Sequence, residues 1–115
     1  MNECEKNTIE HKNGRIYQLL LREVIDKLVD ESRGRKLRIL EVGGGRGSLT
    51  RLIAPLLKDR NVEYHFTDIG KTFVIQAEAE ARQSGFDFMK FGLLDISRDP
   101  VAQGYEGSSF DIILG

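Results

Sequence analysis

The stretch LRILEVGGGRGSLT, residues 37–50, decides the fold of this chain. It opens with a short, mainly apolar run, Leu37–Val42, which is typical of a buried strand in a parallel sheet. Glycines follow at positions 43, 44, 45 and 47. Apolar residues then recur at helical spacing at Leu49, Leu52, Ile53, Leu56 and Leu57. We therefore expect a strand, a glycine-rich turn and a helix that Pro55 bends or shortens.

The glycines at this strand-to-helix turn have a physical reason to be there. Glycine adopts backbone angles that other residues avoid, and without a Cβ it lets the chain approach a ligand closely. The helix that follows presents free N–H groups and the positive end of its dipole. These features predict a ligand-binding turn, the alternative being a tight turn with no ligand.

The spacing of the turn separates three ligand classes. A P-loop needs Gly-Lys-Ser/Thr, but Ser48 and Leu49 follow Gly47 here. The dinucleotide pattern G-x-G-x-x-G also fails, because Gly47 comes one residue too early. What remains is E-x-G-x-G-x-G, with Glu41 two residues before the first glycine. An acid there repels a pyrophosphate but suits an ammonium and a sulfonium, which favours S-adenosylmethionine.

Strand and helix patterns alternate along the rest of the chain. Residues 1–14 are polar, and we expect them to form a flexible lead-in. Periodicity predicts helices over 15–29 and 71–84, strands over 62–67, 86–91 and 110–114, and one loose helical turn over 97–103. Such alternation predicts an α/β fold, an open parallel sheet with flanking helices.

Composition narrows the function. The 115 residues fit one small domain, and a net charge of −1, with no basic stripe, gives no electrostatic footprint for nucleic acid. No apolar run is long enough for a membrane span or a signal peptide, so we expect a cytoplasmic protein with no membrane partner. Cys4 is the only cysteine, which excludes an internal disulfide.

Two aspartates follow predicted strands. In an open parallel sheet the ligand lies at the carboxyl ends of the strands. Asp68 ends the second strand, where we expect it to face a solvent-filled cleft and accept both ribose hydroxyls. Asp95 follows the third strand, where its carboxylate suits an adenine amino group. The alternative for each is an ordinary turn or cap residue.

Four segments together resemble a known family. LRILEVGGGRGSLT, YHFTDIG, FGLLDISRDP and FDIILG follow one another as in class I methyltransferases. The likeness covers about residues 15–115 and is closest to the C-methyltransferase domains of polyketide and nonribosomal peptide synthases. It implies the S-adenosylmethionine-binding half of a methyltransferase, a truncated class I methyltransferase fold, Rossmann-like, with sheet order 3-2-1-4.

The resemblance also implies roles for single residues. The glycines would line the methionine portion, and its amino group would meet Glu41 and carbonyls near Leu114 and Gly115. Asp68 would bind the ribose. The adenine would contact Ile69, Asp95 and Ile96. The implied cofactor-binding residues are Glu41, Gly43, Gly44, Gly45, Gly47, Asp68, Ile69, Asp95, Ile96 and Gly115.

The implied activity is methyl transfer to a small-molecule or carrier-bound substrate. In the synthase-type branch the catalytic histidine and glutamate lie further downstream, so no catalytic residue is assigned, and His11 and His65 are interpreted as incidental. Tyr17 is interpreted as a packing residue, the alternative being a lid over the cofactor. Arg46 is interpreted as a solvent-exposed side chain or a contact to the methionine carboxylate. Cys4 has no assigned role.

Two alternatives stay open: a non-catalytic binding module for S-adenosylmethionine or a nucleotide, and a nicotinamide-binding Rossmann domain.

The last predicted strand is apolar and has no lysine or proline to protect its edge. We therefore expect self-association through that strand.

Overall fold

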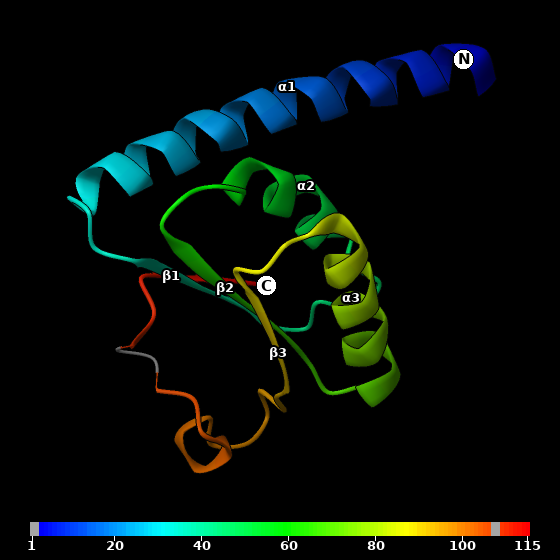
Figure 1. The fold of residues 1–115 in the computed structure, drawn as a ribbon. Helices are drawn as coiled ribbons and strands as arrows, with labels where there is room; N and C mark the ends of the chain where they lie inside the picture. The colour runs from blue at the N-terminus through cyan, green and yellow to red at the C-terminus, as the bar shows by residue number, and fades with distance from the viewer. Residues whose placement is uncertain (1–2, 107–108) are drawn as a thin grey trace.

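The computed structural model describes residues 3–106 and 109–115, with side chains from residue 15 onward (Figure 1). Helices and strands alternate in the order expected for an α/β fold. The elements are α1 (Glu3–Glu31), β1 (Leu37–Glu41), α2 (Ser48–Leu57), β2 (Val62–Asp68), α3 (Lys71–Ser84), β3 (Met89–Leu93), the 3₁₀ turn η1 (Val101–Gln103) and β4 (Ile112–Leu114).

The strands form one parallel sheet in the order β3-β2-β1-β4, which confirms the predicted topology. In the register, Glu41 at the end of β1 lies between Phe66 of β2 and Leu114 of β4. Asp68 at the end of β2 lies beside Leu93 of β3. All strands therefore bring their carboxyl ends to the same edge of the sheet, where loops that follow them meet.

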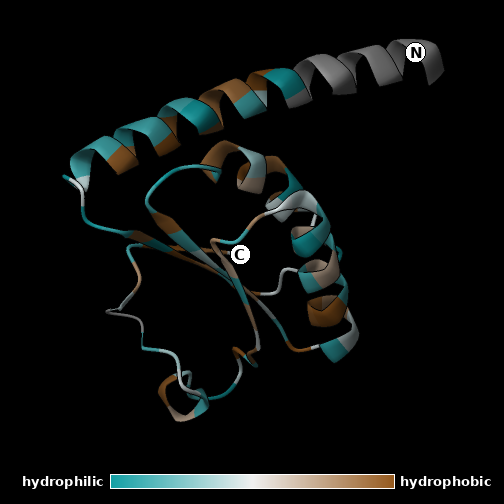
Figure 2. Ribbon diagram, viewed as in Figure 1, coloured by the Kyte–Doolittle hydropathy of each residue, from teal (hydrophilic) through white to brown (hydrophobic). Residues whose placement is uncertain are grey.

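The core lies between one face of the sheet and the helices α2 and α3. Tyr64 and Phe66 of β2 are fully buried, as are Ile39 of β1 and Leu57 of α2. Figure 2 shows hydrophobic residues along the strands and on α2. Because side chains alternate along a strand, the residues between these core positions point to the opposite face.

That second face carries a charged cluster around Glu63 of β2. The carboxylate of Glu63 is 2.7 Å from Nε of Arg38, 3.2 Å from Nε2 of His65 and 3.6 Å from Nζ of Lys90. Phe110 covers part of the cluster, with its ring edge-on to His65 and its face 4.8 Å from the Arg38 guanidinium. The segment before β4 therefore packs on this face of the sheet.

Several element boundaries differ from the prediction. The lead-in over residues 1–14 was predicted to be flexible, but the α1 backbone is already helical from Glu3, because its Glu and Lys residues favour helix and no proline interrupts it. Residues 1–2 lie outside the described residues. Pro55 lies inside α2, which ends at Leu57.

The third strand begins later than residue 86. Gly85 ends α3 in the left-handed conformation, and the backbone N–H of Phe86 donates to the Ala81 carbonyl at 2.9 Å. The N–H of Met89 then donates to the Phe86 carbonyl at 3.2 Å, which closes a turn. Residues 86–88 are thus used to end the helix and turn the chain, so β3 spans Met89–Leu93.

Strand β4 is shorter than predicted and lies at the edge of the sheet. Within the described residues it pairs with β1 alone. The expected self-association through this edge stays a prediction. In the same part of the chain, no helix has the length and apolar character needed to cross a membrane.

Candidate functional site

The loop between β1 and α2 depends on glycine at alternate positions. Gly43, Gly45 and Gly47 have φ angles of 62°, 53° and 83°. These values lie in the left-handed region, where a side chain is strained. The predicted glycine turn is therefore present, and its shape requires glycine at these three positions.

Gly44 is required for a different reason, which is close contact with the neighbouring strand. Its backbone N–H donates to the Thr67 carbonyl at 2.9 Å. A Cβ placed on Gly44 would come within 2.2 Å of Cε2 of Phe66, a fully buried ring. The loop therefore lies directly on the end of β2, with no room for a side chain between them.

Asp68 connects this loop to the loop that follows β2. Its Oδ1 accepts a hydrogen bond from the N–H of Gly45 at 3.0 Å, and its Oδ2 accepts one from the N–H of Gly70 at 2.7 Å. Only 7% of the residue is exposed, so Asp68 is more buried than the solvent-facing position that the sequence predicted. The carboxylate is drawn inward because it serves two backbone donors.

Glu41 lies beneath the same loop and is 2% exposed. Its Oε1 accepts hydrogen bonds from Oγ1 of Thr50 at 2.5 Å and from the hydroxyl of Tyr64 at 2.6 Å. The hydroxyl of Thr67 donates to the Glu41 main-chain carbonyl at 2.6 Å. Burial, followed by the hydrogen bond to Glu41, raises the pKa of Tyr64 well above its usual value, so this phenol stays protonated.

Asp95 forms a turn just beyond β3. Its Oδ1 accepts from both the hydroxyl and the backbone N–H of Ser97, at 2.6 and 3.0 Å. These two bonds hold the pKa of Asp95 below its usual value, the hydroxyl bond being the larger cause. Its own N–H donates to the side chain of Gln103 at 2.8 Å. Asp95 is thus a turn residue whose carboxylate remains ionised and partly exposed.

The ends of the four strands converge. The N–H of Leu94 donates to the Asp68 carbonyl at 3.1 Å, which ties β3 to β2. The N–H of Val42 donates to the Leu114 carbonyl at 2.8 Å, which ties β1 to β4. A Cβ on Gly115 would lie 2.6 Å from Cγ2 of Val42. The structure thus places the predicted residues along one edge of the sheet.

Two apolar side chains at this edge are free for contact. Ile69 is 69% exposed and Ile96 is 67% exposed. Isoleucines are usually buried, and these two follow the acids Asp68 and Asp95 directly. They give the edge apolar surface next to carboxylates.

Three residues of the site were not predicted from the sequence: Thr50, Tyr64 and Thr67. All three are buried, and each donates a hydroxyl hydrogen bond to Glu41. A hydroxyl inside an otherwise apolar strand or helix stripe is the sequence signal that marks them, since a buried polar group needs a partner. The sequence pattern does not show which partner it has.

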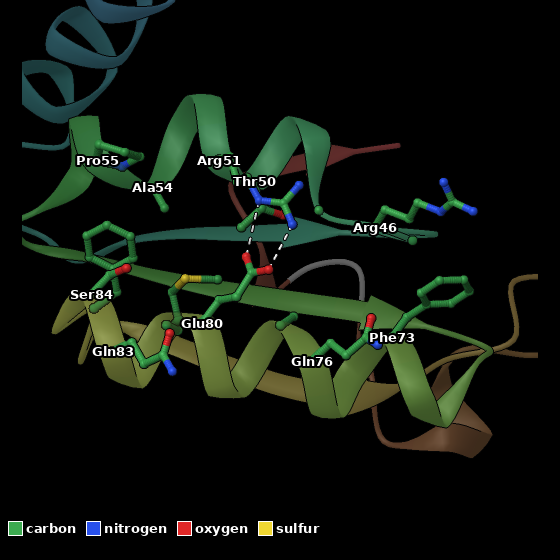
Figure 3. Close-up of a pocket in the computed structure, with 16 residues that line it drawn as sticks. Arg46, Thr50, Arg51, Ala54, Pro55, Phe73, Gln76, Glu80, Gln83 and Ser84 are labelled. Carbon is green, nitrogen blue, oxygen red and sulfur yellow. Dashed lines mark hydrogen bonds and ion pairs between the residues drawn. The ribbon is translucent and has the colours of Figure 1, made fainter.

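A groove of about 330 Å³ runs between α2 and α3 (Figure 3). Arg51 of α2 and Glu80 of α3 bridge it, with a shortest distance of 2.8 Å between the charged groups. The side chain of Glu41 is not among its lining residues, whereas Gly45, Arg46 and Gly47 are. The groove therefore lies beside the glycine loop and not along the strand ends, where the predicted residues gather.

The remaining singled-out residues lie apart from the strand ends or on the surface. Tyr17 is 49% exposed on α1, and Arg46 is exposed and points away from the Arg51–Glu80 pair in Figure 3. His65 belongs to the charged cluster on the second face of the sheet. The side chains of Cys4 and His11 lie outside the described residues. From residue 15 onward, excluding 107–108, the structure shows no cluster of metal-ligating side chains.

Comparison with known proteins gives consistent matches. The family described as a methyltransferase domain matches residues 40–115. The highly reducing polyketide synthase pspA of Penicillium soppii is 40% identical over 87 residues, which cover 71% of this chain and 3% of that protein. The hybrid PKS-NRPS synthetase thnA of Trichoderma harzianum is 39% identical over 77 residues, which cover 67% of this chain and 2% of that protein.

Solved structures match as well. The CurJ carbon methyltransferase superposes with a TM-score of 0.69 and 35% identity, over 84% of this chain and 25% of that chain. The citrinin polyketide synthase CMeT domain gives a TM-score of 0.61 and 33% identity, over 76% of this chain and 24% of that chain. The chain therefore spans a small part of the relatives it matches.

Proposed function

The chain belongs to the methyltransferase domain family, and from that premise we propose that it binds S-adenosylmethionine along the carboxyl edge of its sheet. In this proposal it forms the cofactor side of a site that methylates a carbon atom of a small-molecule or carrier-bound substrate. The likeness to the CurJ and citrinin synthase methyltransferase domains supports carbon as the acceptor.

One observation carries the proposal: the carboxylate of Glu41 is buried beneath the glycine loop without a cationic partner. In the described part of the chain, no lysine, arginine or histidine pairs with it. A buried charge is unfavourable unless it is paired. An ammonium group on a bound amino-acid moiety supplies that partner, and the methionine portion of S-adenosylmethionine carries one.

The other residues of the edge fit the rest of this ligand. The glycine loop leaves no side chain between its backbone and a ligand, and Gly44 keeps the loop against β2. The exposed side chains of Ile69 and Ile96 offer apolar surface for an adenine ring. Each oxygen of Asp68 can accept a second hydrogen bond besides the one it already accepts, which suits ribose hydroxyls.

When bound, S-adenosylmethionine supplies a methyl group on a positively charged sulfur. The residues of this chain would position that methyl group for in-line displacement by a substrate nucleophile. A carbon nucleophile also needs a base, and His65 does not qualify, because it lies on the second face of the sheet beside Glu63. We therefore assign this chain cofactor binding and assign it no base.

A thermal-shift comparison tests the ligand. S-adenosylhomocysteine, the demethylated product, is expected to raise the unfolding temperature of the chain, because a ligand that binds only the folded state stabilises it. NAD at the same concentration is expected to leave it unchanged. A shift with NAD that equals or exceeds the shift with S-adenosylhomocysteine would instead favour a nicotinamide-binding domain.

A non-catalytic binding module is the second candidate, and a different measurement separates it. Transfer of labelled methyl from S-adenosylmethionine to an acceptor, measured on a protein that contains this chain, is expected if the proposal holds. Binding without any transfer to carrier-bound or free acyl acceptors would favour the module.

A further inference from the structure

We propose that Tyr64 and Thr50 are positioning residues for ligand recognition, holding Glu41 by one oxygen so that its other oxygen is presented to the ligand ammonium. The inference rests on the proposed function and deepens it. It assigns the specificity for the amino-acid part of the ligand to two residues that do not touch the ligand.

The geometry singles out one oxygen of Glu41. Both hydroxyls donate to Oε1, at 2.5 Å from Thr50 and 2.6 Å from Tyr64. Among the described residues, none donates to Oε2. Three elements take part, because Glu41 ends β1, Thr50 lies in α2 and Tyr64 lies in β2. The side chain is thereby fixed at one oxygen and available at the other.

The backbone of Glu41 is fixed as well. The hydroxyl of Thr67 donates to its carbonyl at 2.6 Å, and the Thr67 carbonyl in turn accepts the N–H of Gly44 at 2.9 Å. The glycine loop and the Glu41 carboxylate are therefore held to the same strand. A shift of either would change the distance between the carboxylate and the backbone that surrounds the ligand.

The chemistry of the donors matters as much as their position. An arginine or lysine at this place would neutralise Glu41 and leave nothing for a cationic ligand to pair with. Hydroxyl donors stabilise the carboxylate and leave its charge in place. Because burial and the neighbouring carboxylate keep Tyr64 protonated, its hydroxyl proton is available to donate to Glu41. The arrangement therefore suits a ligand that brings its own positive charge.

Two ligands distinguish this role from plain core packing. S-adenosylhomocysteine carries the amino-acid group, whereas 5′-methylthioadenosine has the same adenosine and thioether without it. Tyr64→Phe keeps the buried ring and removes only the hydroxyl. By calorimetry we expect it to weaken S-adenosylhomocysteine binding about tenfold. Its affinity for 5′-methylthioadenosine is expected to stay within about twofold of wild type.

Two controls sharpen the measurement. Tyr105→Phe removes a half-buried hydroxyl that lies near Gly92, away from Glu41, and is expected to change neither affinity. In a Glu41→Gln background the effect of Tyr64→Phe is expected to disappear, because residues that act through one another are not additive. If Tyr64→Phe fails to fold, Thr50→Val is measured in its place. Its control is Thr50→Ser, which keeps the hydroxyl and is expected to keep the wild-type affinity.

The outcomes separate this inference from the proposed function. If Tyr64→Phe weakens both ligands equally, or neither, the positioning role is wrong while the cofactor site stands. If the full effect persists in the Glu41→Gln background, Tyr64 acts independently of Glu41 and the inference is overturned. Failure of the wild-type chain to bind S-adenosylhomocysteine at all would reject the proposed function and this inference with it.

Discussion

The two acids that end neighbouring strands are both buried, but they serve different partners. Glu41 accepts from side-chain hydroxyls, whereas Asp68 accepts from the backbone N–H groups of Gly45 and Gly70. In the proposed site both acids face a ligand, and both also hold the protein together. Substitutions at either position therefore affect folding as well as binding.

Asp68→Ala is expected to lower the stability of the chain even without ligand. The change leaves two loop N–H groups without their acceptor, and a hydrogen bond to a charged group contributes roughly 1.5–3 kcal/mol. Chemical denaturation measures the loss, with Asp95→Ala as the matched control, since Asp95 accepts only within its own exposed turn. Equal stability of Asp68→Ala and wild type would show that the loop is held without this carboxylate.

Some residues of the site can be predicted from the sequence alone, and others cannot. Glu41, the glycines, Asp68 and Asp95 were predicted because each lies at a recognisable local position, at or just beyond the end of a strand. Thr50 and Tyr64 were not, because their partner comes from another element and emerges only once β1, β2 and α2 are packed. The burial of Asp68 was missed for the same reason: its donors belong to two different loops.

At the scale of elements, the charged cluster on the second face of the sheet links β1 to β2 and β3. Glu63 accepts a hydrogen bond from Arg38 and lies near His65 and Lys90. Asp111 accepts hydrogen bonds from the backbone N–H of Arg38 and from the side chain of Arg35. The Arg38 hydrogen bond is the main cause that lowers the pKa of Glu63 from 4.5 to about 2. The cluster therefore makes the free energy of unfolding depend on pH in the acidic range.

The sign of this dependence follows from the lowered pKa. A carboxyl that is more acidic in the folded state stabilises the fold above its unfolded pKa and loses that contribution as the pH falls. For Glu63 the window runs from 4.5 down to about 2. As the pH falls through this window, wild type is expected to lose more unfolding free energy than Glu63→Gln, which lacks the titrating carboxyl. The difference is expected to be only on the order of 1 kcal/mol, because the cluster is partly solvated.

Urea denaturation at several pH values measures this effect. Glu80→Gln is the matched control: the hydrogen bond to Arg51 lowers the pKa of Glu80 too, but this pair is about half exposed, so solvent screens it and a smaller effect is expected. Identical pH profiles for wild type and Glu63→Gln would mean that the cluster does not contribute to stability. Asp95 and Asp111 also have lowered pKa values, so some acid dependence is expected to remain in the variant.

Element boundaries were predicted less well than element types. The residues FDF at 86–88 have strand-like composition, yet they form the turn that ends α3 at Gly85. Composition alone does not distinguish a turn that closes on a helix end from the start of a strand. In the same way, polar residues before Arg15 resemble a flexible segment, although their backbone continues α1.

At the scale of the whole molecule, the sheet order and the family membership were both predicted and confirmed. Alternating strand and helix patterns require parallel crossovers, and right-handed crossovers leave few orders for the strands. Parallel pairing of β1 with β2 then places the carboxyl ends of the two strands side by side. The likeness to the CurJ carbon methyltransferase and to the citrinin polyketide synthase CMeT domain extends over most of the chain at 33–35% identity.

Two regions are candidates for the ligand site: the carboxyl edge of the sheet and the groove between α2 and α3. Gly45, Gly47 and Thr50 belong to both regions. The edge carries Asp68, Ile69, Asp95 and Ile96, whereas the groove carries side chains such as Gln76, Gln83 and Phe86.

Titration of the ¹⁵N-labelled chain with S-adenosylhomocysteine, followed by NMR, tests whether this ligand binds along the carboxyl edge of the sheet. We predict that amide shifts change at the glycine loop, at Asp68–Gly70 and at Asp95–Ile96, while the amides of Gln76, Gln83 and Phe86 stay in place. Changes confined to the groove residues, or no change even at saturating ligand, would show that the ligand does not bind at this edge.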